Sequence, residues 1–367
     1  MGMPGTGKCR VFLGVLLLLE PLVFIGDLTG VSDQDDLSLR VFRSFPFVKL
    51  MSYQEFFSSR KKFSDPAIVY FDFPHRLWDR HVEHGPSLYG TKEYGSSIVN
   101  LAFRIADQFK TRFPRARAVN HPLSIVSERD KLLAKALVRE AGVPTVHSLD
   151  RHLQSVLDAL DDGSSVYVKV RFGSLSKGIT FLSPGHWVTN FSYDGRRIDR
   201  YPSERSWPER EVTGDLHFLS LLLSQDVVVE KAVENPLSRE FRLGLRVYSV
   251  YGVADRRFAY ASLARKGITS GASTGLVDRF LSYDDLGALL PSSSLDGALR
   301  LAERAASALH LSYAGIDILF EGDDFLPLFL EANSFPGTKN KSPSARKALL
   351  LSLYGGMFSD YASLSHH

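Results

Sequence analysis

The most constraining feature of the sequence is the segment AGIDILFEGDDFLPLFLEANSFPG at residues 314–337. Two apolar runs flank the turn-forming stretch EGDD, and this pattern predicts an antiparallel β-hairpin. If the hairpin folds about Asp324, then Asp317 and Glu331, each seven residues from that centre, become cross-strand neighbours. Because side chains alternate along a strand, Asn333 should lie on the same face as Glu331.

Both acids of this hairpin lie in apolar surroundings, so we expect their carboxylates to be at least partly buried. Like charges that face each other destabilise a pair of strands, and burial of an unpaired carboxylate is costly. A hard divalent cation bound by oxygen atoms would offset both costs. The hairpin therefore indicates a magnesium site, and an ordinary hairpin with two surface acids is the alternative.

A lysine followed by a glycine- and serine-rich loop suggests a phosphate site. Lys169 lies within a predicted strand at residues 166–170, and the sequence FGSLSKGI follows at residues 172–179. The backbone N–H groups of such a loop can bind phosphate, and lysine adds a compact cation. Alone this signal is weak, because loops rich in glycine and serine are common.

A second lysine, Lys131, lies near the start of a helix predicted over residues 127–141. Apolar residues recur at helical spacing, Ser127 is placed to cap the first turn, and Gly142 would end the helix. A cation in the first turn opposes the helix dipole. We therefore expect the Lys131 ammonium group to act elsewhere in a site.

A third motif is VVVEKAV at residues 227–233, which predicts an apolar strand that turns polar at its end. Glu230 and Lys231 lie at that end, and Glu240 follows farther along the chain. Side-chain and backbone groups at such a strand end can line the edge of a purine base.

Taken together, these motifs resemble the ATP-grasp superfamily, and within it D-alanine–D-alanine ligase, glutathione synthetase and RimK-like ligases. The order is a lysine, a second lysine with its loop, Glu-Lys with a later Glu, then Asp and finally Glu-x-Asn-x-x-Pro-Gly. The match covers residues 120–343, and EANSFPG at residues 331–337 is its most specific part.

The resemblance implies an α/β (α+β) fold in which two ATP-grasp subdomains sandwich the nucleotide. A small α/β pre-ATP-grasp domain would occupy residues 1–120. The central subdomain, with the Gly/Ser loop, would occupy residues 121–225, and the C-terminal subdomain, with the magnesium site, residues 226–367.

The resemblance also implies a role for each residue that matches a motif. The nucleotide-binding residues would be Lys131 and Lys169 at the phosphates, Ser174 and Gly178 in the closing loop, Glu230, Lys231 and the backbone of Ala232 or Val233 at the adenine, and Glu240 at the ribose. The ligands of magnesium, or of manganese in its place, would be Asp317, Glu331 and Asn333. The catalytic residues would be Arg265 and Lys169, with Arg242 as a second candidate for the arginine.

The implied activity is an ADP-forming ligase that joins a carboxylate to an amine, or to a thiol, through an acylphosphate. The acid would belong to a small molecule or a peptide, and backbone N–H groups near residues 271–275 would help to stabilise the tetrahedral intermediate. A kinase or a non-catalytic nucleotide-binding scaffold of the same fold is the alternative. His121 and His310 lie in mixed surroundings and are expected to be structural or exposed rather than catalytic.

Two departures from the family concern the loop and a later connection. Lys177 lies where a small residue is common in these ligases, and the polar segment 183–213 is longer than the usual connection. The composition of this segment predicts a mobile hairpin or a lid.

The N-terminus carries a segment, GMPGTGKC at residues 2–9, that is close to the P-loop pattern. A P-loop needs a preceding strand and a hydroxyl at its last position, where this chain has Cys9. These departures favour a flexible leader over a second nucleotide site at Lys8.

The next segment is similar to a signal peptide, because Lys8 and Arg10 precede the apolar run at residues 11–19. Glu20 and Pro21 interrupt the run, and a buried first strand explains the whole apolar stretch at residues 11–25 equally well. We expect a cytoplasmic protein with no membrane partner, with a signal or anchor at residues 8–25 as the alternative.

Composition limits the remaining function classes. A formal net charge of +3 argues against a nucleic-acid partner held by bulk charge, and the single cysteine, Cys9, excludes a cysteine-based metal site. The composition is compatible with a homo-oligomer as well as with a monomer. The other predicted elements are strands at residues 67–73, 118–120, 241–251 and 258–263 and helices at residues 94–113, 295–309 and 344–353.

Overall fold

The structure is a computed structural model that describes residues 21–28, 39, 42–43, 48–83, 88–174, 176–199, 208–234, 241–265, 277–336, 344, 348–349 and 351. The chain divides into two compact units. The first comprises Met1–His75, Ala106–Val119 and Lys341–His367, and the second comprises Arg76–Ile105 and Asn120–Asn340. Both contain β-sheets and helices, which confirms the mixed α/β fold class.

The first unit is built on a parallel sheet with the strand order β2-β1-β3-β4. Its elements are β1 (Leu22–Gly26), β2 (Val48–Ser52), α3 (Tyr53–Ser58), β3 (Ile68–Phe71), β4 (Arg117–Ala118) and the end of α5 (Lys92–Arg112). β1 and β3 are buried along their whole length, as their β-branched and aromatic residues favour. The strand and helix predicted at residues 67–73 and 94–113 are confirmed, whereas β4 is shorter than predicted and begins at Arg117.

The apolar stretch near the N-terminus ends in β1, which agrees with the interpretation of a buried first strand. Residues 1–20, which carry the segments similar to a P-loop and to a signal peptide, lie outside the described residues. None of the helices in the described part of the chain combines the length and the apolar character that a membrane crossing requires.

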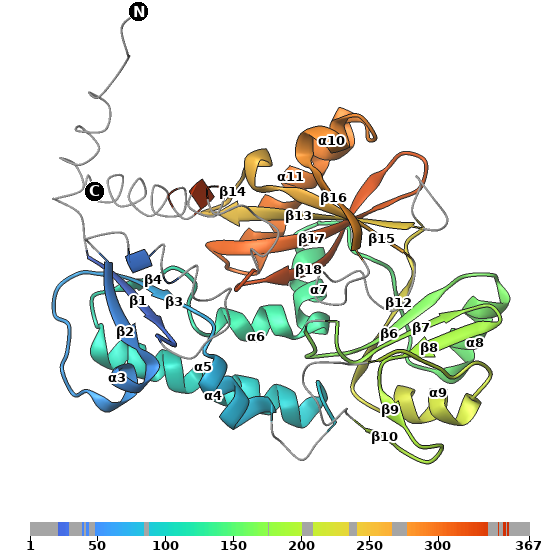
Figure 1. Cartoon of the computed structure of the whole chain (residues 1–367), viewed down its shortest axis with the longest axis horizontal. Coiled ribbons are helices and arrows are strands. Elements are labelled where there is room, and N and C mark those ends of the chain that lie inside the picture. Colours follow the sequence, from blue (N-terminus) through green and yellow to red (C-terminus); the bar gives the residue numbers. More distant parts are fainter. Residues whose placement is uncertain are drawn as a thin grey trace, which may run out of the picture. The chain divides into compact units, whose positions relative to one another are not determined.

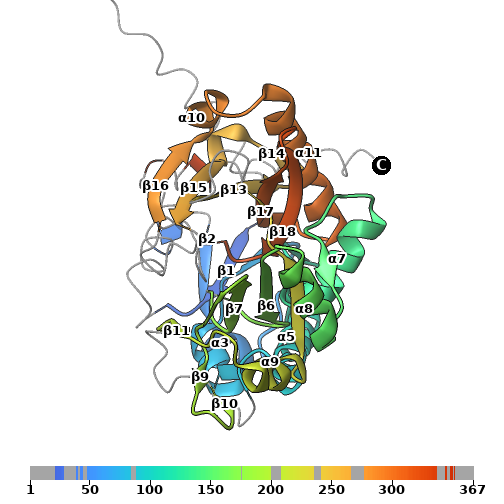
Figure 2. The same ribbon diagram turned by 90° about the vertical axis from the view of Figure 1, so that its right-hand side faces the viewer.

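The second unit contains two six-stranded sheets, and the first of them is the central sheet, with the order β11-β8-β7-β6-β12-β5. Its elements are β5 (Ser148–Leu149), β6 (Val166–Val170), β7 (Ile179–Ser183), β8 (His186–Thr189), β11 (Arg210–Glu211), β12 (Val227–Lys231) and two helices, α8 (Leu153–Asp161) and α9 (Leu216–Leu223). The two helices pack against each other beside the sheet (Figure 2). The strands predicted at residues 166–170 and 227–233 are confirmed, although β12 ends at Lys231.

The segment predicted as a mobile hairpin or lid, residues 183–213, is partly built into this sheet. It contributes β8, β11 and a small hairpin of β9 (Ser192–Tyr193) and β10 (Ile198–Asp199). Trp187, Val188 and Phe191 are buried, so the first part of the segment is packed core rather than a lid. Residues 200–207 lie outside the described residues.

The second sheet of this unit, the C-terminal sheet, has the order β16-β15-β13-β17-β18, and β14 pairs with β13 (Figure 1). Its elements are β13 (Phe241–Val250), β14 (Val253–Ala254), the turn η2 (Arg256–Phe258), β15 (Tyr260–Arg265), β16 (Val277–Ser282), α10 (Tyr283–Gly287), α11 (Ser292–Ala308), β17 (Tyr313–Glu321) and β18 (Leu326–Asn333). The alanine-rich face of α11 packs on β13, β17 and β18, which leaves the opposite face of these strands for polar side chains. The structure confirms the strands predicted at residues 241–251 and 258–263, the predicted β-hairpin, and the helix predicted at residues 295–309.

The helix predicted over residues 127–141 is two helices, α6 (Ser124–Arg129) and α7 (Lys131–Glu140). The predicted cap was wrong. Asp130 ends α6 and caps α7, because its carboxylate accepts the backbone N–H groups of Leu132 and Leu133. Ser127 instead lies within α6 and donates to the carbonyl of Ser124. The helix ends at Gly142 as predicted, with a positive φ of 70° there.

Two short consecutive elements precede α5, namely α4 (His75–Trp78) and a π-helical turn at Asp79–Glu83. The predicted closing helix at residues 344–353 falls mostly outside the described residues, although residues 344, 348–349 and 351 are helical. The three-part division at residues 120 and 225 stays a prediction, and β12 lies in the central sheet, after the second of these boundaries.

Candidate functional site

The predicted pairing of the two acids in the hairpin is confirmed. Asp317 on β17 lies opposite Glu331 on β18, and Gly315 lies opposite Asn333. A register shift follows Asp317, so the pairing continues with Ile318 opposite Phe329. The Nδ2 of Asn333 donates to Oδ2 of Asp317 at 3.3 Å, which brings all three predicted metal ligands to one face of the hairpin.

The strands β15, β13, β17 and β18 are neighbours in the C-terminal sheet (Figure 1), and a row of polar residues crosses them at this level. Tyr260 on β15 pairs with Arg246 on β13, Arg246 pairs with Asp317, and Asp317 pairs with Glu331. The guanidinium of Arg246 donates from Nε to Oδ1 of Asp317 at 2.6 Å and from Nη2 to Oδ2 at 2.5 Å. The sequence interpretation missed Arg246, yet an arginine that alternates with buried Leu245 and Val247 is a signal for the polar face.

Glu230 lies between two lysines at the end of β12. Its Oε2 is 2.7 Å from Nζ of Lys169, and its Oε1 is 2.6 Å from Nζ of Lys135. Burial raises the pKa of Glu230, but the charges of Lys169 and Lys135 outweigh it and lower the pKa to about 2. The carboxylate therefore fixes Lys169, and its predicted contact with adenine stays a prediction.

Lys135 is the second residue that the sequence interpretation missed. It is 1% exposed, on the same side of α7 as Ala134 and Val138, and it also donates to the carbonyl of Val146 at 3.3 Å. A lysine at an apolar position of an amphipathic helix, four residues after Lys131, is the signal that could have found it.

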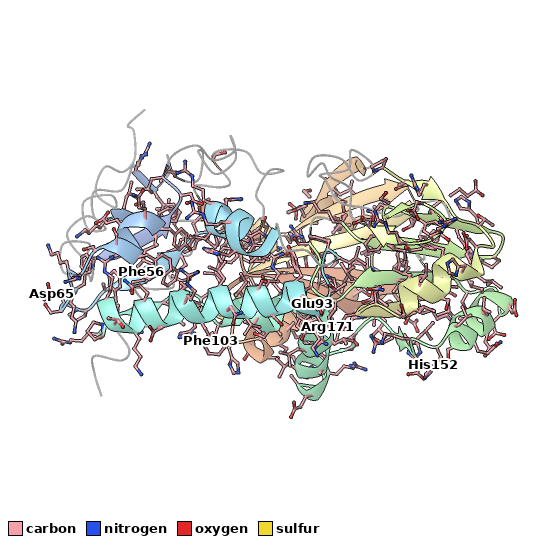
Figure 3. All side chains as sticks on the ribbon, turned by 90° about the horizontal axis from the view of Figure 1, so that it is seen from below. Phe56, Asp65, Glu93, Phe103, His152 and Arg171 are labelled. Atoms are coloured by element: carbon pink, nitrogen blue, oxygen red, sulfur yellow. The ribbon has the colours of Figure 1, made fainter. Side chains whose placement is uncertain are left out.

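Lys131 at the start of α7 reaches the Gly/Ser loop, where its Nζ donates to the carbonyl of Gly173 at 2.5 Å. Asp130 holds this turn in place, because the Arg171 guanidinium donates to both of its carboxylate oxygens, at 2.7 and 2.6 Å. Figure 3 shows the Arg171 side chain beside this end of α7. Burial lowers the pKa of Lys131 to about 8, although Glu331 favours its charged form.

The loop that contains Ser174 and Gly178 packs closely on Val170. A Cβ at Gly173 or Gly178 would lie 2.3 or 2.8 Å from a Val170 methyl carbon, so both positions require glycine. Asn190 holds the far side of the loop, since it accepts the N–H of Ile179 at 2.8 Å and donates to the carbonyl of Ser176 at 2.7 Å.

Tyr89, also missed from the sequence, holds the near side of the same loop. Its hydroxyl accepts the backbone N–H of Ser174 at 2.9 Å, and the Lys177 ammonium lies 5.5 Å from the centre of its ring. Lys177, the departure noted in the sequence, thus lies on an aromatic face beside the loop.

A buried carboxylate anchors the chain just after the metal-ligand candidates. Glu128 on α6 is 4% exposed, and its Oε2 accepts the backbone N–H of Ser334, the residue that follows Asn333. Asn120 reaches the same turn through a hydrogen bond from its Nδ2 to the carbonyl of Ser334 at 3.4 Å. Both contacts orient the end of β18.

The remaining predicted residues are only partly described. Lys231 is exposed at the end of β12, and the N–H of Ala232 donates to the carbonyl of Ser165 at 2.8 Å. Val233 follows in the chain. The residues or side chains that lie outside the described part are Glu240, residues 271–275 and the side chains of Arg242 and Arg265.

Asp317, Glu331 and Asn333 form a donor set suited to one hard cation, because they offer carboxylate and amide oxygens at one place. Burial raises the pKa of Glu331, but Lys131, Lys169 and Arg246 outweigh it and lower the pKa, so this carboxylate is ionised at neutral pH. Within the described ranges, no group of three or more His, Cys, Asp and Glu side chains is arranged to hold a metal. The cation would therefore depend on Asn333 and on oxygens from a bound ligand.

Comparison with solved structures identifies the fold. The chain aligns with the ATP-grasp ligase PsnB over 91% of its own length and 99% of that chain, at 13% identity and a TM-score of 0.53. The D-cycloserine synthetase DcsG aligns over 90% and 98%, at 15% identity and a TM-score of 0.52. This chain has the ATP-grasp fold. D-alanine–D-alanine ligase from Bacillus anthracis also matches, over 93% and 97%, at 15% identity and a TM-score of 0.50.

The sequence matches no protein-family model and no curated protein. The ATP-grasp resemblance in fold is therefore carried by the arrangement of elements. At these identities the agreement extends to the fold and leaves the chemistry to the residues.

Proposed function

We propose that the protein is an ATP-dependent ligase that activates a carboxylate as an acylphosphate and passes the acyl group to an amine. The observation that carries this proposal is the nearness of two lysines to the hairpin carboxylate Glu331. The charges of Lys131, beside the Gly/Ser loop, and of Lys169, on β6, both lower the pKa of Glu331. Cations for a polyphosphate and oxygens for its metal ion thus occupy one site.

In this proposal Lys131 and Lys169 bind the nucleotide phosphates, while the backbone of the Gly/Ser loop covers them. Asp317, Glu331 and Asn333 would hold Mg²⁺, or Mn²⁺ in its place, which would neutralise charge on the transferring phosphate when bound. Arg246 already lies beside these ligands, and Arg265 stays a predicted catalytic residue. Solved complexes of PsnB contain Mg and ADP, or AMPPNP, which supports the same cofactors here.

The first step joins an oxygen of the acid substrate to the γ-phosphorus and breaks the bond to ADP. Such a transfer asks the protein mainly for position and positive charge. The lysines and Arg246 provide that charge in a half-buried setting, where it is screened less than in water. Ion pairs fix Lys169 and Arg246 before the substrate binds, so little reorganisation is needed.

In the second step the amine nitrogen attacks the acyl carbon, the carbon–oxygen bond to phosphate breaks, and the nitrogen loses a proton to solvent. The products are an amide, inorganic phosphate and ADP. A solved PsnB complex contains a precursor peptide, which supports a peptide substrate for this chain, and we propose that the peptide supplies the acid. A small-molecule acid is the other candidate.

Product analysis tests the proposal. The protein is incubated with Mg·ATP, hydroxylamine as a general amine, and panels of acidic peptides and small acids. We expect ADP release that depends on the acid, together with a hydroxamate. A product that gains a phosphoryl group would indicate a kinase instead, and nucleotide binding without acid-dependent ADP release would indicate a scaffold.

The pKa of Lys131 predicts a pH dependence of nucleotide binding. Burial lowers this pKa to about 8, so the free protein loses the cation as the pH rises through that value. The association constant for Mg·ADP should therefore fall about tenfold per pH unit above pH 8, as for any group that must be protonated to bind. Calorimetry between neutral pH and pH 9.5 measures it.

Lys131→Arg provides the matched control, because arginine keeps its charge over this range. Its association constant should be independent of pH between neutral pH and pH 9.5, whereas Lys177→Met should leave the wild-type slope intact. A wild-type slope of zero above pH 8 would contradict a role for Lys131 at the phosphates.

A further inference from the structure

Arg246 occupies both carboxylate oxygens of Asp317, which is one of the candidate metal ligands. The contact is bidentate, at 2.6 and 2.5 Å, and both side chains are about one-fifth exposed. A fork of this kind is the strongest geometry available to an arginine–carboxylate pair. The carboxylate that should serve a metal ion is thus already matched by a protein cation.

The backbone holds Arg246 in this position. Arg246 and Asp317 are directly paired on adjacent strands, so their side chains leave the same face of the sheet side by side. Gly315, two residues before Asp317, lies beside the arginine stem, where a Cβ would make an ordinary van der Waals contact with Cδ of Arg246 at 3.4 Å. The same Cβ would lie 2.6 Å from Cβ of Pro336, so the turn at Pro336 is what requires a glycine here.

The remaining capacity of Asp317 is small. A carboxylate offers about four lone-pair sites. Arg246 takes two of them, and Nδ2 of Asn333 takes a third at 3.3 Å. Glu331, by contrast, has no ion pair with Arg246 among the described residues, and three nearby cations, Lys131, Lys169 and Arg246, keep its carboxylate ionised.

We propose that Arg246 takes the place of a second divalent ion at this site, so that the chain binds its nucleotide with a single metal ion coordinated mainly by Glu331 and Asn333. A second divalent cation at Asp317 would bind the same two carboxylate oxygens as the guanidinium of Arg246. The two positive charges would then lie close together and repel each other. This inference rests on the proposed function, because it concerns the metal that accompanies the nucleotide.

Electron paramagnetic resonance tests the inference with Mn²⁺ as the probe. Mn²⁺ is titrated into the full chain at saturating AMPPNP, and the loss of the free Mn²⁺ signal gives the number of bound ions. We expect one tightly bound Mn²⁺ per chain in the wild type and two in Arg246→Met. The second ion should bind roughly tenfold or more tightly in the variant than in the wild type, because the net charge of the ligand set tunes cation affinity.

Arg257→Met is the matched control, because Arg257 is an exposed arginine that pairs with Asp255 away from this row. It should bind one ion, like the wild type. If Arg246→Met does not fold, Arg246→Gln removes the same charge and keeps an amide donor. Two tight ions in the wild type, or one ion in the wild type and in both Arg246 variants, would overturn the inference alone. Failure of the wild type to bind AMPPNP would overturn the proposed function as well.

Discussion

Glu331→Gln is expected to lower kcat/KM for ATP by about a thousandfold, the size of effect seen when one preorganised charge-stabilising group is removed from an active site. Glutamine keeps the shape of the side chain and removes the charge. Glu331 is held ionised by Lys131, Lys169 and Arg246, which lower its pKa against the effect of burial. Without that charge, the site loses its main metal ligand, and Lys131, Lys169 and Arg246 lose a nearby negative charge that offsets their repulsion.

The measurement is steady-state ADP formation at several Mg²⁺ concentrations with an acid that supports turnover. Glu321→Gln is the matched control, because Glu321 is an exposed glutamate at the end of β17, the strand that pairs with β18. The control should behave as the wild type. If Glu331→Gln keeps most of the wild-type rate at every Mg²⁺ concentration, then Glu331 is not the metal ligand that we propose.

Glu230→Gln is expected to lower the free energy of unfolding by about 3 kcal/mol, because it leaves two buried lysines without their shared counter-charge. Lys135 is 1% exposed and Lys169 is only partly exposed, so neither ammonium can recover full hydration. For a unit of this size the midpoint of thermal unfolding should fall by roughly 6–12 °C. Calorimetry at neutral pH measures that midpoint.

The dependence on pH separates this effect from a packing defect. The pKa of Glu230 is about 2 in the folded protein, below its usual value of 4.5. The stability that it contributes is therefore fully present above pH 4.5 and is lost as the pH falls toward 2. The difference between wild type and variant should shrink over that window, and Lys135→Met should restore part of the stability of Glu230→Gln. A difference that is the same at pH 7 and pH 3 would contradict the role of the ion pair.

The sequence predicts the hairpin and its register well because both follow from local rules. Its turn residues mark the centre, its apolar runs set the strands, and the alternation of side chains places Asp317, Glu331 and Asn333 on one face. The sequence also predicts a helix over residues 127–141, but it predicts neither the division into α6 and α7 nor the cap of α7. Asp130, rather than Ser127, is the cap, and Arg171, which directly follows β6, holds its carboxylate.

The partners within the site could not be predicted, because they depend on which strands and helices become neighbours. Glu230 meets Lys135 only when α7 packs beside β12, and Arg246 meets Asp317 only when β13 pairs with β17. No local pattern encodes these pairings. The sequence does signal Lys135, a charged side chain where the helical spacing favours an apolar one. It also signals Arg246, which alternates with buried Leu245 and Val247 and therefore marks the polar face of the strand.

The most direct measurement is a crystal structure of the full chain with AMPPNP and Mn²⁺, in which anomalous scattering locates the metal. Our account predicts the triphosphate within hydrogen-bonding reach of Lys131 and Lys169, with the metal bound to Glu331 and Asn333. A nucleotide bound elsewhere, or a metal that does not contact the β17–β18 hairpin, would contradict it.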